Sequence, residues 1–434
     1  MHQRQARTAA TGLFLGGWRY KGAAVTLSRM SRWWSLAALA ALTGCGGPDA
    51  LDAWPAALVV RSPGAQTGLT DYPVNEPPAV RLLDANGNPI QGAAVTFTVL
   101  GGGGSVTGSV ATTGSDGVAT VGSWTIVAGS NSMQASIPAP FRVDPVIFAA
   151  TGMAQSYQID LLYVTPPSVG NQAVFASVVT RWQQMVYGDV PDFSFISLPA
   201  GSCLGNEPAF GGAIDDLLIF VTLDSIDGPG NILGGATPCF IRNPGFTSIV
   251  GAMVFDTADL ADLNSFGLLD DVIMHEMGHV IGFGTIWDAF NLLAGPASSG
   301  GLDPHFVGQK ALAAFDRAGG TAYTGGLKVP VENTGGPGTV DGHWRESAFG
   351  NELMTGFVNL GSNPLSIVSV ASLGDVGYLV NYGAADLYSH AFSVAPVPGA
   401  PVGPVRRIPL GNDILRVPIY TMDRRGRVTG VYRP

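Results

Sequence analysis

The stretch that decides the fold is Val272–Thr285, VIMHEMGHVIGFGT, in which two histidines stand four residues apart. On a helix, residues at this spacing lie on one face, so His275 and His279 can offer two imidazole nitrogens to a single metal ion. A catalytic zinc uses three protein ligands and leaves a position for water, and Glu276 can accept a proton from that water. The stretch therefore predicts a zinc-hydrolase helix whose third ligand lies elsewhere.

The competing interpretation is an amphipathic core helix with two satisfied histidines. It leaves Gly278 inside the helix and Gly282 just after it unexplained, since glycine within a helix costs about 1 kcal/mol. We expect these glycines to serve a sharp turn after the second histidine. In the compact form of the motif the third histidine would stand at position 285, which is Thr285.

The third ligand has several candidates downstream: Asp303, His305, His343 and His390. His343 lies in a glycine-rich loop, with Gly335–Gly338 and Gly342 before it, that leads to a turn carrying Met354. Glycine permits the backbone conformations that such a loop needs. The residues favour His343 and leave the other three open.

Three motifs together resemble the leishmanolysin family of metzincin metalloendopeptidases: HExxHxxGF at 275–283, Gly342–Trp344, and NELMTG at 351–356. The resemblance runs from about Asp215 to Tyr382. It implies that His275, His279 and His343 bind one catalytic Zn²⁺ and that Glu276 is the general base. It also implies that Met354 is the methionine of a turn beneath the metal and that Gly282 is the motif's structural glycine.

The resemblance has one departure. Parasite members of the family resemble proenzymes silenced by a pro-segment cysteine, whereas no cysteine stands between Cys45 and Cys203 here. Latency by that route is not expected.

Composition sets the broad class. Of 434 residues, 12% are charged, while 60 are glycine and 30 proline, which is typical of turn-rich, largely β architecture. The net charge of −10 and the lack of a basic stripe argue against nucleic acid as a partner.

The segment from about 56 to 153 has the pattern of short strands and turns. Val95, Phe97 and Val99 alternate with threonines, and glycine- or asparagine-rich turns separate several such runs. This predicts an immunoglobulin-like sandwich. The stretch VRLLDANGNPIQGAAVTFTV resembles bacterial Ig-like modules of the invasin and intimin type, which implies a stalk or adhesion role.

The N-terminus has the pattern of a targeting segment. We expect translation to start at Met30, with 1–29 outside the true protein, 30–44 a lipoprotein signal peptide and 45–55 a linker. Leu42–Cys45, LTGC, resembles the bacterial lipobox, which implies lipidation of Cys45. The protein is then exported, to the outer membrane or cell surface, and an ordinary secretory signal is the alternative. In an oxidising compartment Cys203 and Cys239 are expected to form a disulfide rather than remain two free thiols.

Residues 157–391 are expected to form an α+β catalytic domain. Strands are predicted at Ile159–Val164, Asp216–Leu223 and Ser248–Phe255, and a helix at Val169–Tyr187. The helix of the zinc motif is expected to begin near Asn264 and Ser265.

Two further expectations complete the domain plan. In zinc peptidases of this type the last strand before the motif helix, here Ser248–Phe255, lines the cleft, where a peptide can add to its edge. The proline-rich segment 392–434 is expected to be a C-terminal tail without an assigned function.

The sequence thus predicts a multidomain protein, an all-β immunoglobulin-like sandwich followed by an α+β zincin (metzincin) domain. The predicted function is an exported, lipid-anchored zinc metalloendopeptidase that acts on proteins or peptides. The alternative is a surface adhesin with a non-catalytic zincin-like domain, and Glu276 discriminates the two because a binding domain needs no base.

Overall fold

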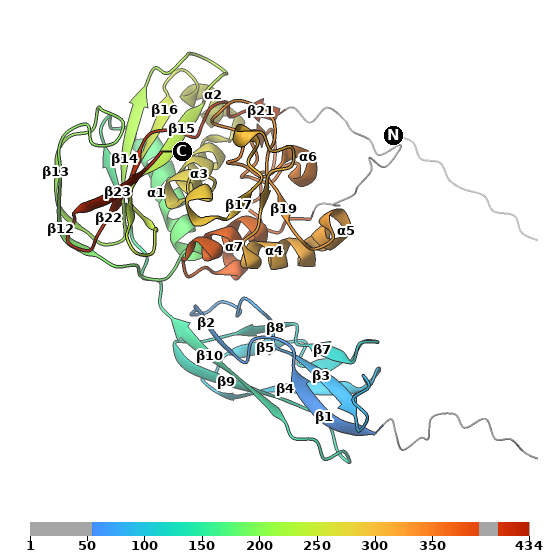
Figure 1. The fold of residues 1–434 in the computed structure, drawn as a ribbon. Helices are drawn as coiled ribbons and strands as arrows, with labels where there is room; N and C mark the ends of the chain where they lie inside the picture. The colour runs from blue at the N-terminus through green and yellow to red at the C-terminus, as the bar shows by residue number, and fades with distance from the viewer. Residues whose placement is uncertain (1–53, 390–406, 434) are drawn as a thin grey trace, which may run out of the picture. The chain divides into compact units, whose positions relative to one another are not determined.

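The computed structural model describes residues 54–389 and 407–433 (Figure 1). Cys45, the linker before residue 54 and His390 lie outside the described residues, so the predictions made for them remain predictions. No helix in the described ranges is long and apolar enough to cross a membrane.

Residues 54–153 form strands only, arranged in three sheets. The largest sheet has the order β2-β10-β9-β4-β6, and the others are β1-β3-β7 and β5-β8. The strands are β1 (Pro55–Val60), β2 (Ala65–Leu69), β3 (Ala79–Asp84), β4 (Ala94–Gly101), β5 (Ser105–Thr107), β6 (Val110–Thr112), β7 (Val118–Thr120), β8 (Ser123–Thr125), β9 (Gly129–Ser136) and β10 (Val146–Met153).

The core of this domain comes from the alternation that the sequence shows. Val95 and Phe97 of β4 point inward, and they join Trp124, Met133 and Phe148 in one buried cluster. Because side chains alternate across a strand, the threonines between them face away from that cluster. The predicted immunoglobulin-like domain is confirmed at this level.

A six-stranded sheet forms the centre of the second domain, in the order β11-β14-β16-β15-β22-β23. The strands are β11 (Ile159–Tyr163), β14 (Leu217–Asp224), β15 (Gly234–Arg242), β16 (Ser248–Asp256), β22 (Ile419–Met422) and β23 (Val428–Tyr432). β11, β14 and β16 are parallel, and β15 runs antiparallel to β16. Three of these strands lie where the sequence predicts them.

Both faces of the sheet are covered. Ile219 and Val221 of β14 belong to the core beneath the helices, while Leu218 and Phe220 belong to a second cluster. That second cluster includes residues of the hairpin formed by β12 (Phe193–Leu198) and β13 (Phe210–Ile214). A strand buried on both sides reads as a continuous apolar run, as β14 does.

The longest helices of the described residues are α1 (Val169–Met185), α3 (Leu269–Ile281) and α7 (Ile367–Val376) (Figure 1). The indole of Trp182 in α1 donates a hydrogen bond to the backbone oxygen of Met274 in α3, 3.1 Å away. The remaining elements are α2 (Leu260–Phe266), η1 (Asp288–Phe290), β17 (Leu293–Ala294), η2 (Ala297–Ser299), β18 (His305–Phe306), α4 (Gln309–Phe315), η3 (Asp316–Gly320), α5 (Thr321–Thr324), β19 (Val329–Pro330), α6 (Glu346–Phe349), β20 (Phe357–Asn359), η4 (Tyr382–Ala384) and β21 (Arg407–Pro409).

Two expectations need correction. Asn264 and Ser265 lie inside the short helix α2 and do not cap α3, because Gly267, at φ 67°, ends α2 and separates the two helices. The strand at Ser248–Phe255 is not an edge strand, because β14 and β15 pair with its two sides. The strand that the sequence analysis missed, β15, lies on its outer side.

The predicted C-terminal tail also needs correction. Residues 407–433 contribute β21, which pairs with β20, and β22 and β23, which extend the six-stranded sheet beyond β15. The prolines concentrate at 396–404, outside the described residues, and the segment after them has apolar residues that find a partner in β15. Ile419 and Met422 are buried there.

Cys203 and Cys239 are joined as a disulfide, with Cα atoms 5.4 Å apart. The bridge ties the loop after β12 to β15. The two cysteines are 36 residues apart in the sequence. Closing a loop of this length stabilises a fold by roughly 3–4 kcal/mol in the chain-entropy description.

Candidate metal centre

Helix α3 carries two of the three histidines on one face. His275 and His279 are both fully buried, and their Nε2 atoms lie 2.9 Å apart. The helix ends at Gly282, whose φ of 128° turns the chain away directly after the second histidine. This is the sharp turn that the sequence predicts.

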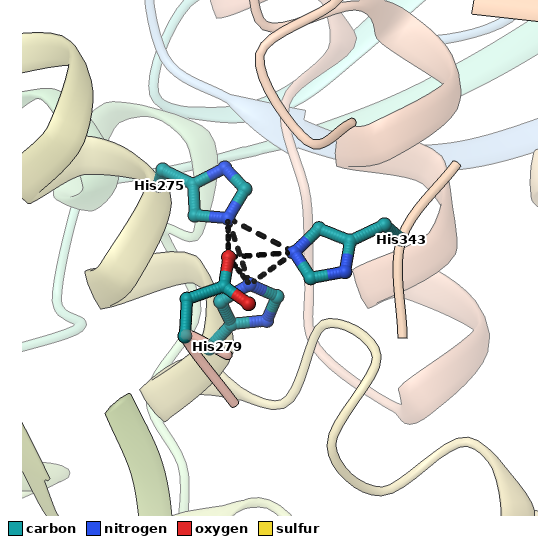
Figure 2. Close-up of side chains that lie close together, drawn as sticks. His275, His279 and His343 are labelled. Carbon is teal, nitrogen blue, oxygen red and sulfur yellow. Dashed lines mark hydrogen bonds and ion pairs between the residues drawn. The ribbon is translucent and has the colours of Figure 1, made fainter. Parts of the chain in front are cut away.

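His343 reaches the same point from a distant loop. Its Nε2 lies 3.2 Å from that of His275 and 3.1 Å from that of His279, so the three imidazoles converge (Figure 2). Gly284 makes this approach possible, because a Cβ there would stand 2.0 Å from the backbone oxygen of Gly342. The second glycine of the GFG sequence therefore lets the histidine loop approach the end of α3.

The outer nitrogen of each imidazole faces a backbone oxygen. His275 Nδ1 lies 2.7 Å from Leu353 O, His279 Nδ1 lies 2.8 Å from Phe283 O, and His343 Nδ1 lies 2.9 Å from Thr339 O. A carbonyl only accepts hydrogen bonds, so each Nδ1 is the protonated nitrogen. Each neutral ring then turns the lone pair of its Nε2 toward the other two.

Three such lone pairs repel one another unless a cation lies between them. In a tetrahedral zinc site with Zn–N bonds of about 2.0–2.1 Å, the nitrogens stand about 3.3–3.4 Å apart. The observed separations of 2.9–3.2 Å are close to this value. The donor set and its spacing fit a zinc ion.

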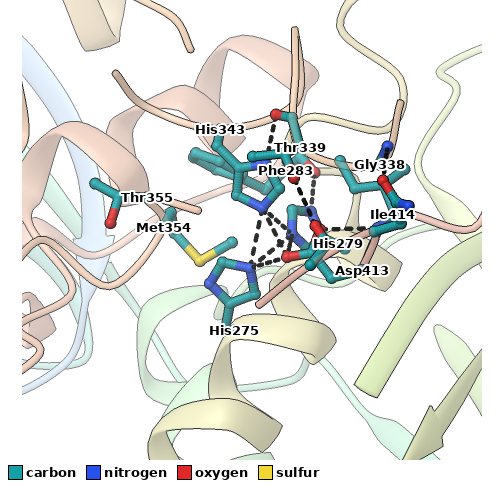
Figure 3. A network of polar contacts seen from close by, with 12 residues as sticks. His275, His279, Phe283, Gly338, Thr339, His343, Met354, Thr355, Asp413 and Ile414 are labelled. Atoms are coloured by element: carbon teal, nitrogen blue, oxygen red, sulfur yellow. Dashed lines mark hydrogen bonds and ion pairs between the residues drawn. The ribbon is translucent and has the colours of Figure 1, made fainter. Parts of the chain in front are cut away.

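A fourth donor, Asp413, was missed by the sequence analysis. Its Oδ2 lies 3.1 Å from His275 Nε2, 3.0 Å from His343 Nε2 and 4.0 Å from His279 Nε2 (Figure 3). The carboxylate is fully buried. The three histidines and Asp413 form the one cluster of the described residues in which four buried metal-ligating side chains meet.

The charges in this cluster act on one another. Burial lowers the pKa of His279 well below its usual value, and the neighbouring imidazoles lower it further. Burial opposes protonation of His343 as well, but the Asp413 carboxylate outweighs it and raises the pKa of His343. Burial alone would raise the pKa of Asp413, yet His343 and a hydrogen bond with His275 hold it below its ordinary range. Asp413 thus supplies a negative charge beside the three imidazoles.

Glu276 is the other ionisable group of the motif. It is fully buried, and neither carboxylate oxygen has a hydrogen-bond partner among the described residues. Burial, together with the nearby charge of Asp413, raises the pKa of Glu276 well above its ordinary value. An unpaired buried carboxylate is costly. This cost is understandable where the group meets water or substrate beside a metal ion.

Met354 packs beneath the site, next to His275 (Figure 3). A Cβ on Gly278 would lie 3.0 Å from the Met354 methyl carbon and 3.1 Å from Trp182. Gly278 therefore serves close packing of α3, not the turn that follows it. The methionine turn is held by the buried Glu352, which accepts a hydrogen bond from the Met354 backbone nitrogen at 2.7 Å.

The rival ligands lie elsewhere. His305 is in β18, with its Nδ1 against Asp303 O, and is not part of the cluster. Asp303 pairs with Lys328 and Arg345. Thr285 stands at the sequence position where the compact motif has its third ligand. Its hydroxyl donates a hydrogen bond to the backbone oxygen of His279 at 2.9 Å.

Two family models match parts of this chain. Residues 207–395 match the family described as leishmanolysin, and residues 78–141 match the bacterial Ig-like domain of group 1. A comparison with curated proteins found no match. Among solved structures, the D00–D0 domain of intimin matches with 17% identity and a TM-score of 0.17, over 21% of this chain and 45% of that one.

Proposed function

We propose that this chain is a zinc-dependent metalloendopeptidase. The match to leishmanolysin supports a metallopeptidase. The observation that carries the proposal is the convergence of three Nε2 atoms within 3.2 Å, each on a ring whose Nδ1 donates to a backbone oxygen. His275, His279 and His343 would hold the ion.

A bound zinc ion would polarise the scissile carbonyl and lower the pKa of water toward neutrality. The protein's own part falls to Glu276, which stands next to the first ligand on α3. Its buried, unpaired carboxylate would accept the proton of the attacking water and pass it to the leaving amine. An adhesin whose zincin-like domain only binds would have no use for this buried charge.

Metal content tests the ligand set. The His343→Ala variant should lose zinc by more than about 100-fold in affinity, because even residues that merely support ligands cost about 10–100-fold when removed. His305→Ala is the matched control and should keep one zinc per chain, as should His390→Ala. A zinc affinity of His343→Ala equal to that of the unaltered chain, with an unchanged circular dichroism spectrum, would refute the site.

Peptide cleavage tests the activity. The purified chain is incubated with a peptide library and the products are identified by mass spectrometry. Internal cleavage that 1,10-phenanthroline abolishes and added zinc restores is expected. Absence of any metal-dependent cleavage, in the unaltered chain and in Asp413→Ala alike, would contradict the proposal.

We also propose export with a lipid anchor at Cys45. The disulfide between Cys203 and Cys239 supports an oxidising compartment, and the LTGC sequence supports lipidation. Mass spectrometry of the mature N-terminus in a bacterial host tests this, and an unmodified Cys45 would count against the anchor.

A further inference from the structure

We infer that residues 411–416 occupy the substrate groove of the metal centre and that Asp413 is a fourth protein ligand, so that the described form is latent. This inference rests on the proposed function. Residues 411–416 belong to the region predicted to be a C-terminal tail. They contact β15, the loop that carries His343, and the histidines themselves.

The first contact is with the outer edge of β15. The backbone nitrogen of Ala236 donates to Asp413 O at 2.7 Å, and the nitrogen of Leu415 donates to Ala236 O at 3.0 Å. The segment therefore meets β15 at one isolated parallel bridge, between Ile414 and Ala236. An extended peptide bound to a strand edge uses the same hydrogen bonds. A substrate that added to β15 at this place would have to displace the segment.

The second contact is with the loop that carries His343. Gly338 N donates to the Asn412 side chain at 3.1 Å, and Thr339 Oγ1 donates to Gly411 O. On the same loop, a Cβ added to Gly342 would meet the end of the Ile414 side chain at 2.1 Å. The segment is thus held between β15 and the histidine loop.

The third contact is with the histidines themselves. Asp413 Oδ2 lies 3.0–3.1 Å from two of the three Nε2 atoms, and Asp413 Oδ1 accepts a hydrogen bond from Ile414 N at 3.0 Å. A structural zinc site has four protein ligands, whereas a catalytic site leaves one position open. With a carboxylate as the fourth ligand, the position that water needs is taken.

Two hollows follow one another along the segment. One, of about 250 Å³, is lined by Ile414, Leu415 and Arg416. The other, of about 500 Å³, is lined by Gly411 and Asn412. Asp413 lies between them in the chain. If the segment blocks one continuous groove at the metal centre, the groove would remain open only on either side of the scissile position. The two hollows fit this expectation.

The test uses cobalt(II), whose visible absorption reports its ligands, and acetohydroxamate, a small chelating probe. The unaltered chain loaded with cobalt should show no spectral change when acetohydroxamate is added. Asp413→Ala and the isosteric Asp413→Asn should both retain cobalt on three histidines and shift their spectra with the probe. Asp423→Ala, in the turn between β22 and β23, is the matched control and should behave as the unaltered chain.

The outcomes separate the two claims. If all four proteins bind cobalt and respond equally to the probe, latency is overturned and the metal centre stands. If Asp413→Ala alone loses cobalt while folded, the carboxylate is needed to hold the ion and latency is again overturned. If no protein takes up cobalt, the proposed function falls and this inference with it.

Peptide cleavage gives a second readout. Activity in the latent form is limited to the fraction of molecules in which the segment has left the groove. Asp413→Ala should therefore cleave peptides roughly 10–100-fold faster than the unaltered chain, while Asp423→Ala should not. Equal rates in Asp413→Ala and the unaltered chain would overturn the inference.

Discussion

The two domains differ in what they bury. Within residues 54–153, Asp84 is the one charged side chain among those described that is buried, and it caps a turn by accepting from Asn86 N and Asn88 N. The cluster around Trp124 consists of apolar side chains. Such a core stabilises a sandwich and performs no chemistry.

The second domain buries many ionisable groups: Glu207, Asp216, Arg242, Asp256, Asp259, His275, Glu276, His279, Glu332, Asp341, His343, Glu352 and Asp413. Each costs free energy unless it is paired. Most have partners, such as Glu352 at the methionine turn, and Glu276 is the exception. The one buried carboxylate of this set with no hydrogen-bond partner among the described residues therefore stands next to His275, which is where the proposed chemistry needs it.

The largest expected effect is at Glu276. Glu276→Gln keeps the shape of the side chain but cannot accept a proton, so the rate of peptide cleavage should fall by about 10²–10⁴-fold. Zinc content should stay the same. The rate is measured with an internally quenched peptide, both in the unaltered chain and in an Asp413→Ala background. If Glu276→Gln cleaves the peptide at the original rate, Glu276 is not the general base.

A substitution in the apolar core of the first domain should lower stability and leave zinc content and peptide cleavage unchanged. Trp124 is fully buried, and Trp124→Ala should destabilise the sandwich by about 3–5 kcal/mol through the cavity it leaves. Scanning calorimetry should show one transition lowered. Zinc content and peptide cleavage serve as the control and should not change. Loss of zinc in this variant would break the comparison, because the two cores would then be coupled.

Local patterns in the sequence predicted much of the site. The parts that depend on contacts between distant residues were not predicted. The spacing of His275 and His279 and the apolar run of β14 are visible within a single helix or strand. In β15, by contrast, Gly234, Gly235 and Pro238 weaken the strand pattern, and Pro238 coincides with a shift in register. A strand with such residues depends on its neighbours and is missed by periodicity.

Asp413 shows the limit more clearly. Its partners His275 and His343 lie 138 and 70 residues earlier in the chain. No motif surrounds it, and the prolines at 396–404 make the region look like a tail. The resemblance to a family indicated where His343 belongs, but a carboxylate from a segment after the matched residues has no such signal. Only the pairing of residues 413–422 with β15 reveals it.

Gly278 offers an effect of intermediate size. Gly278→Ala gains about 1 kcal/mol of helix propensity, but the new methyl group lies 3.0–3.1 Å from Met354 and Trp182. Overpacking costs about 1–3 kcal/mol, so the domain should lose up to about 2 kcal/mol. Gly170→Ala is the matched control, because nothing lies within 4 Å of a Cβ there and it should not destabilise. Urea denaturation measures the unfolding free energy of both variants. If Gly278→Ala is as stable as Gly170→Ala, close packing beneath the site is contradicted.

The smallest effect is expected at Asp271, in the first turn of α3. Burial raises the pKa of this carboxyl from 3.8 to about 6, although Asn363 donates a hydrogen bond to it at 2.7 Å. Between about pH 4 and pH 6 the folded chain therefore binds more protons than the unfolded chain, and its stability falls as the pH rises through this range.

Asp271→Asn removes that cost. The pKa shift corresponds to about 3 kcal/mol at most, and the group is partly exposed while the helix dipole favours its negative charge by about 0.3–1 kcal/mol. The net gain in unfolding free energy should be about 1 kcal/mol at pH 8 and should vanish below about pH 4, where both states hold the proton. Urea denaturation of both proteins at pH 4 and pH 8 measures this. A gain that is the same at both pH values would show that packing, and not the buried charge, sets the difference.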